Sequence, residues 1–89
     1  MRLIITAKEV PYRKGHIEVS NVHKGCVNVE MWSIHPDVSP RLSRTGNLDY
    51  EDCEITSNVE LELTADEARE LADGLLAAAA VVSAQTGAG

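Results

Sequence analysis

The hydrophobic pattern changes its period at one point near the C-terminal end, and this change constrains the fold more than any other feature. Between residues 59 and 63, Val and Leu alternate with Glu, which is typical of a strand with one buried face. Thr64 and Glu67 then form a capping box, in which each side chain can bond the other residue's amide. Helical spacing of apolar residues follows at Ala68, Leu71, Ala72, Leu75, Leu76 and Ala79. The pattern predicts a strand that runs directly into a helix.

Three further strands are predicted before this unit. Residues 3–10 are rich in β-branched side chains, and residues 16–20 and 27–32 alternate apolar with polar positions. Turns are expected at residues 11–15 and 23–25, where Pro and Gly interrupt the pattern. The three strands can form an antiparallel meander.

A long connection is expected over residues 35–47, which contain two prolines and one glycine. Residues 48–55 can start a fourth strand, with a bulge or short break near Ser57 and Asn58. We therefore predict an α+β fold: an antiparallel four-stranded sheet in the order β-β-β-loop-β-α, with one C-terminal helix packed on one face. Residues 1–83 form the single domain, and residues 84–89 form a flexible tail.

The composition indicates a small aliphatic core. The 89 residues include no Phe, one Trp and two Tyr, and a core of this kind often depends on a partner chain. We find neither a secretory apolar segment nor an apolar run of membrane-spanning length. A cytoplasmic location is therefore expected, with Cys26 and Cys53 as buried thiols.

The charge is divided unevenly along the chain. The net charge is −6, but residues 1–47 carry +3 and residues 48–89 carry −9. An acidic surface does not favour non-specific contact with nucleic acid or docking on anionic membranes. We expect neither as a direct partner.

Enzymatic and metal-binding functions have weak support in the sequence. His23 and Cys26 have ligand-like spacing and could join His35 and Cys53 in a zinc domain or metal-dependent enzyme, but paired knuckles are missing. Neither a nucleophile elbow nor a Gly-rich phosphate loop is present. We expect no enzyme activity, no catalytic residues, no metal site and no cofactor, and keep the metal hypothesis as an alternative.

Residues 49–54 form the densest acidic run. In a strand, Asp49, Glu51 and Cys53 would share one face, where two carboxylates could hold a cation or act as an acid/base pair. A solvated edge strand protected by its charges explains the same residues without a ligand. Because these charges are expected to be solvated, Asp49, Glu51, Asp52 and Glu54 are also candidate residues for contact with a protein partner.

Two other features extend the predicted partner-binding surface. Arg41 and Arg44 lie three residues apart in the long connection and could clamp a carboxylate or phosphate. Trp32 is out of phase with Val27, Val29 and Met31, so it should face away from the helix as a binding anchor.

The helix itself predicts self-association. After Gly74 it is apolar on every side, and Ala77, Ala78 and Val81 continue the side that was charged one turn earlier. A helix that is apolar all round is normally buried all round. We therefore predict a homodimer with these three residues in its interface.

The segment from Leu61 to Ala79 resembles the ending of small uncharacterised actinobacterial and actinophage proteins. In those proteins a last strand leads into an Ala-rich helix of the form Leu-Thr-x-Asp-Glu-Ala-Arg-x-Leu-Ala, which matches about a quarter of this chain. The resemblance implies a sheet-plus-helix fold and a phage or mobile-element origin. We therefore expect an accessory protein that binds a host or phage protein stoichiometrically. The alternatives are an acidic nucleic-acid mimic that inhibits a bacterial defence system, and a structural assembly component.

Overall fold

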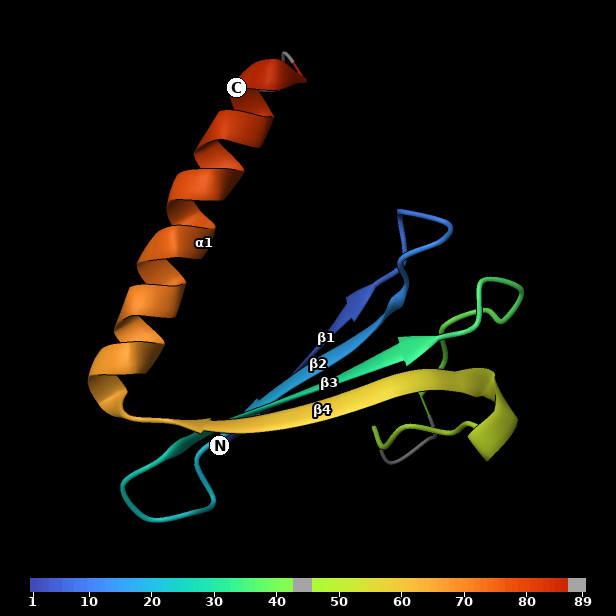
Figure 1. The fold of residues 1–89 in the computed structure, drawn as a ribbon, viewed down its shortest axis with the longest axis horizontal. Coiled ribbons are helices and arrows are strands. Elements are labelled where there is room, and N and C mark those ends of the chain that lie inside the picture. Colours follow the sequence, from blue (N-terminus) through green and yellow to red (C-terminus); the bar gives the residue numbers. More distant parts are fainter. Residues whose placement is uncertain (43–45, 87–89) are drawn as a thin grey trace.

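The computed structural model describes residues 1–42 and 46–86 and has an α+β fold, as predicted. Its elements are four strands, one short 3-10 helix and one long α-helix (Figure 1). In chain order they are β1 (Arg2–Ala7), β2 (Gly15–Ser20), β3 (Val27–Ile34), η1 (Asp52–Glu54), β4 (Ile55–Leu63) and α1 (Ala65–Gln85).

The four strands form one antiparallel sheet in the order β1-β2-β3-β4. The meander and the final strand are therefore confirmed, but the start of the fourth strand differs from the prediction. Residues 48–51 are not in a strand of the sheet, η1 follows, and β4 continues through Ser57 and Asn58 without a break. The irregularity lies one residue earlier, because Ser33 pairs with Ser57 while Ile34 pairs with Ile55. Thr56 is thus the extra residue of a bulge.

The strand register separates the side chains into two faces. Odd-numbered positions of β1 to β3, and of β4 from Ser57 onward, form what we call the helix-side face, which is apolar except for Ser33 and Ser57. Even-numbered positions form the loop-side face, which carries most of the polar and charged strand residues. A period of two in each strand produces this division, because successive side chains point to opposite sides of a sheet.

The capping box at the start of α1 is present as predicted. The Glu67 amide donates to the Thr64 hydroxyl at 3.1 Å, and the Thr64 amide donates to the Glu67 carboxylate at 2.8 Å. The helix ends at Gln85, two residues inside the predicted tail. Asp66 and Glu67 lie in its first turn, where negative charge interacts favourably with the helix dipole.

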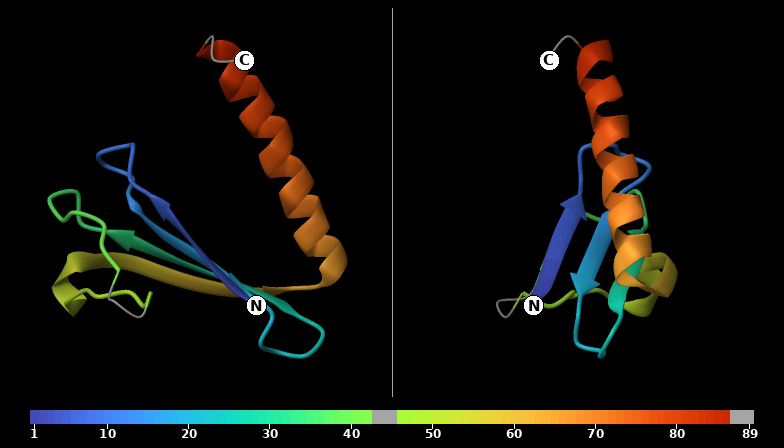
Figure 2. Two further views of the ribbon diagram at one scale, coloured as in Figure 1. Left: turned by 180° about the vertical axis from the view of Figure 1, so that it is seen from behind. Right: turned by 90° about the vertical axis from the view of Figure 1, so that its left-hand side faces the viewer.

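The helix follows the sheet as predicted, but it packs on the sheet only near its start. Figure 1 shows α1 rising from the end of β4 and separating from the sheet, and the left view in Figure 2 shows the same open angle from behind. Every described helical residue is exposed except Ala68, which is half-buried. A sequence pattern reports which helix face is apolar, but it does not fix the direction in which the helix leaves the preceding strand.

Burial within the single chain is correspondingly small. Among the described residues, Val29 and Ile34 are the only buried apolar side chains, whereas His16, Ser20 and Asn28 are buried polar ones. The Asn28 side-chain oxygen is buried without a hydrogen-bond partner in the described part of the chain. Two buried aliphatic side chains provide little of the burial energy that must offset the conformational entropy of folding.

Candidate interaction surfaces

The helix-side face and α1 enclose an apolar cleft that is narrow at the start of the helix. A cavity of about 180 Å³ lies at its base. The lining residues are all aliphatic: Val19, Val27, Val29, Leu63, Ala68, Leu71, Ala72 and Leu75. The capping box lies beside the base of this cleft, at the turn by which the chain leaves β4 and enters α1.

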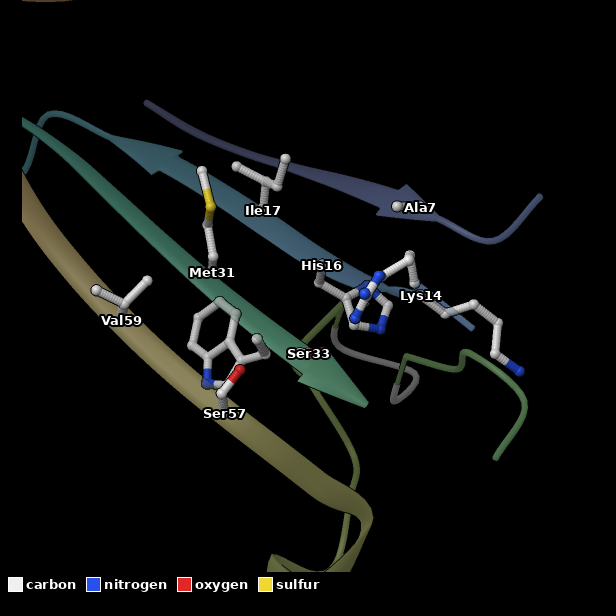
Figure 3. Close-up of a pocket in the computed structure, with 11 residues that line it drawn as sticks. Ala7, Lys14, His16, Ile17, Met31, Ser33, Ser57 and Val59 are labelled. Carbon is white, nitrogen blue, oxygen red and sulfur yellow. The ribbon is translucent and has the colours of Figure 1, made fainter. Parts of the chain in front are cut away.

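Away from the helix start, the cleft opens onto bare sheet. Figure 3 shows Ile17, Met31 and Val59, from three neighbouring strands, extending from one face of the sheet beside a second hollow of about 300 Å³. Large apolar side chains on this face are exposed: Leu3, Ile5, Met31, Val59 and Leu61. A contiguous exposed apolar face of this kind is characteristic of an interaction site.

The second half of α1 forms the opposite wall and is exposed on all sides. Leu75 is 63% exposed and Val81 is 58% exposed. Ala77 and Ala78, which were predicted with Val81 to form a dimer interface, are also exposed. Residues 75–85 contain no charged side chain, so this wall is apolar like the sheet face across the cleft.

On the loop-side face, a buried histidine attaches the long connection to the sheet. His16, only 2% exposed, has its Nδ1 3.0 Å from the Thr6 hydroxyl and its Nε2 2.6 Å from the Tyr50 hydroxyl. The Tyr50 hydroxyl also accepts the Arg41 amide at 2.7 Å. Burial lowers the pKa of His16, because the charged ring would lose its hydration. Burial therefore favours the neutral form of the ring.

Arg41 is fixed in the same cluster. Its guanidinium donates to the Glu54 carboxylate at 2.6 Å and lies 4.7 Å from the centre of the Tyr50 ring. The hydrogen bond from Arg41, followed by that from the Glu51 amide, lowers the pKa of Glu54. Arg41 is thus already paired within the chain, which weakens its predicted role as a clamp for an external anion. Arg44, its predicted companion, lies outside the described residues.

The acidic run does not have the strand geometry that we predicted. Asp52–Glu54 form η1, with Glu51 as its N-cap, so the expected alternation of faces over residues 49–54 is wrong. Local capping explains the difference, because the Glu54 carboxylate accepts the Glu51 amide and so favours a turn over an extended chain. Asp49, Glu51 and Asp52 are exposed, as a contact surface requires.

A second acidic feature emerges from the register. Glu18, Glu30 and Glu60 are directly paired across β2, β3 and β4 on the loop-side face. Arg2 bonds Glu18 at 2.8 Å, and the Asn58 amide donates to Glu30 at 3.1 Å. The row joins residues far apart in the sequence, so the linear pattern gave no sign of it.

Trp32 occupies the loop-side face, opposite His16 on β2 and Asn58 on β4. The predicted orientation away from the helix agrees with this register, although the residue is half-buried rather than fully exposed. A half-buried indole still offers contact area to a partner.

The proposed zinc ligands are not assembled within the chain. His23 and Cys26 lie in the turn before β3, whereas His35 follows the far end of that strand and Cys53 lies in η1. In the described residues, no group of three or more His, Cys, Asp or Glu is arranged to hold a metal ion. Both cysteines are free, and the expectation of buried thiols is wrong for Cys53, which is exposed, and too strong for Cys26, which is half-buried.

Sequence reasoning missed His16 and Tyr50 as the centre of the loop-side cluster. The sequence offered one signal: His16 alternates with the apolar residues of its strand and so shares a face with its polar residues. Its partner, however, lies 34 residues away. No periodicity links two residues at that separation.

Comparison of the chain with protein-family models, curated proteins and solved structures finds no match. Within the described residues, no helix combines the length and apolar character needed to cross a membrane.

Proposed function

We propose that this chain is a non-catalytic accessory protein that acts by binding another polypeptide stoichiometrically. One observation carries the proposal: both walls of the cleft, the helix-side face and the second half of α1, are apolar and exposed. Such a surface binds a complementary apolar surface rather than a polar small molecule, because its strand and helix positions offer few hydrogen-bonding groups. Given the sequence resemblance, we expect the cytoplasm of a phage host as its setting.

The loop-side surface supports a second, weaker contact in the same function. Arg41 and the acids Asp49, Glu51 and Asp52 are exposed outside the cleft, and Trp32 is half-buried on the loop-side face. Polar rims of this kind contribute specificity and association rate more than affinity. We propose this surface for the reversible recognition of a host or phage protein.

Affinity purification with a matched pair of variants tests the proposal. Leu61→Lys places a charge in the cleft, whereas Glu60→Lys places the same side chain on the opposite face of the same strand. Wild type and Glu60→Lys should retain a polypeptide at a fixed stoichiometry, either a second copy or another protein, and Leu61→Lys should lose it. A wild-type chain that is monomeric and purifies alone from its native cells would overturn the proposal.

A second candidate function, imitation of a nucleic-acid backbone, is favoured by the row of Glu18, Glu30 and Glu60. Three carboxylates on adjacent strands produce a line of negative charge on the loop-side face. This function predicts that the chain competes with duplex DNA for a basic defence protein. It also predicts that combined Glu→Gln substitution of the row, in a folded protein, abolishes inhibition. Unchanged inhibition would eliminate this candidate.

A further inference from the structure

We infer that the cleft is filled by α1 of a second copy of this chain, so that two chains clasp each other about a two-fold axis. Each helix would lie between the sheet and the helix of the other copy. The inference rests on the proposed function and names the polypeptide that occupies the same cleft.

The first reason is that each chain carries both halves of the interface. The helix-side face is an apolar sheet surface without a helix over most of its area, and the second half of α1 is an apolar helix without a sheet. A two-fold arrangement covers both surfaces at once, because every contact made by one copy is repeated by the other.

The second reason is the match in length. At about 1.5 Å per residue, the 21 residues of α1 extend about 31 Å. At about 3.3 Å per residue, the nine residues of β4 extend about 30 Å. If α1 of a second copy runs antiparallel to α1 of the first, it therefore reaches from the open end of the sheet to the base of the cleft.

The third reason is the change in composition along α1. Charged residues occur only before Gly74, where the helix lies beside its own sheet, and residues 75–85 are uncharged. In the clasped dimer, the second half of each helix is covered on one side by the other helix and on the other side by the second sheet. Ala77 and Val81, on the side away from their own sheet, would contact that second sheet. This placement retains them in the predicted interface and explains why they are small or apolar.

The fourth reason is charge complementarity at the ends of the cleft. The acidic start of α1 carries Glu70 and Asp73, and the β1–β2 turn at the opposite end of the sheet carries Arg13. None of these three side chains forms an ion pair with a described residue of its own chain. The antiparallel arrangement places the helix start of one copy over the β1–β2 turn of the other. Opposite charges then meet in two chains that are each net acidic.

A mixed-label nuclear magnetic resonance experiment tests the arrangement directly. Isotope-labelled and unlabelled chains are denatured together, refolded and examined for contacts between labelled and unlabelled molecules. The expected result is a mass twice the 9.6 kDa of the chain, with intermolecular contacts from the Ala77 and Val81 methyls to those of Ile5, Met31 and Val59. A monomer, or a dimer in which these contacts are only intramolecular, would overturn the inference.

A matched pair of substitutions provides a second test. Ala77→Glu places a charge in the proposed interface, and Ala65→Glu makes the same change at the exposed start of the same helix. Ala77→Glu should raise the dimer dissociation constant on the order of a hundredfold or more, because the buried charge appears twice in a symmetric interface. Ala65→Glu should not raise the constant, because an added acid at the helix start lies near the basic β1–β2 turn of the other copy. Equal constants for both variants would overturn the inference, and circular dichroism confirms that each variant is helical.

The two proposals can fail separately. If the chain is monomeric but another protein purifies with it and is lost in Leu61→Lys, the second-copy inference fails and the proposed function stands. If the chain is monomeric and purifies alone, both fail.

Discussion

The two faces of the sheet differ in how they are completed. On the loop-side face, residues of the long connection return to the sheet, and Tyr50, Arg41 and Glu54 form hydrogen bonds that keep His16 buried. On the helix-side face, α1 moves away and leaves aliphatic side chains exposed. The loop-side face therefore gives His16, a buried polar residue, partners within the chain, whereas much of the apolar helix-side face stays exposed for another molecule to cover.

The sharpest test of the loop-side face, on which the long connection packs, is Ile34→Ala. Ile34 is 3% exposed on the loop-side face, so truncation should leave a cavity and lower the free energy of unfolding by about 2–5 kcal/mol. Denaturant unfolding followed by Trp32 fluorescence measures this loss. Association of the protein should stay unchanged at concentrations where it is folded. A loss below about 1 kcal/mol would contradict the closed packing of this face.

The matching test of the helix-side face, which is exposed in the single chain, is Leu61→Ala. Leu61 is 60% exposed in the single chain, and a substitution at a surface that stays exposed usually changes stability by about 0.5 kcal/mol or less. If a second copy covers it, we expect a loss of about 2 kcal/mol per chain and a melting temperature that rises with protein concentration. Calorimetry over a range of concentrations separates the two outcomes.

Tyr50→Phe removes the hydroxyl that joins the long connection to the sheet. The His16 Nε2 atom and the Arg41 amide would each lose a partner, and an unsatisfied buried polar group costs about 1–3 kcal/mol. We expect lower stability and faster hydrogen exchange at the Arg41 amide, with no change in association. Exchange rates equal to wild type would show that the hydroxyl does not hold the loop.

The dependence of folding stability on pH should also reflect the groups on the loop-side face, first of all His16. Burial lowers the pKa of His16, so the unfolded chain takes up a proton more readily than the folded chain as pH falls below the ordinary value of 6.5. Stability should be complete above that pH and decline below it, and His16→Gln should remove this decline.

A separate loss of folding stability is expected at lower pH, where Glu54 becomes protonated. Arg41 lowers the pKa of Glu54, so its stabilisation is present above the ordinary value of 4.5 and is lost as pH falls through the folded pKa. Melting temperatures between pH 8 and pH 3 would resolve the two phases. A single phase below pH 4.5 would exclude the contribution of His16.

The smallest expected effect concerns the glutamate row. Glu60→Lys would place a cation directly opposite Glu30 and relieve like-charge repulsion between adjacent strands. We expect the free energy of unfolding to rise by about 0.2–1 kcal/mol, less at high salt, with no effect on association. A decrease in stability would mean that the row is held by an interaction that lysine disrupts.

Sequence patterns predicted the parts of the fold that depend on near neighbours. The alternation in β2, β3 and β4 and the Thr64–Glu67 capping box are local signals, and the structure confirms all of them. The wrong prediction for residues 49–54 also has a local origin, because the Glu54 side chain stabilises a turn where charge alternation had indicated a strand.

The candidate sites could be predicted only in part. The apolar second half of α1 was visible in the sequence because it departs from helical amphipathicity. The His16–Tyr50 cluster and the glutamate row were not, because both depend on pairing between distant segments.

Apart from residues 48–54, the sequence by itself determined which segments become strands and helix, and which side of each is apolar, because side-chain period and capping act over a few residues. Only the tertiary structure decided that α1 leaves the sheet at an open angle and that the long connection packs on the opposite face. Those outcomes depend on the direction of a single turn after Leu63 and on hydrogen bonds between residues far apart in the chain. Neither is encoded in a local pattern.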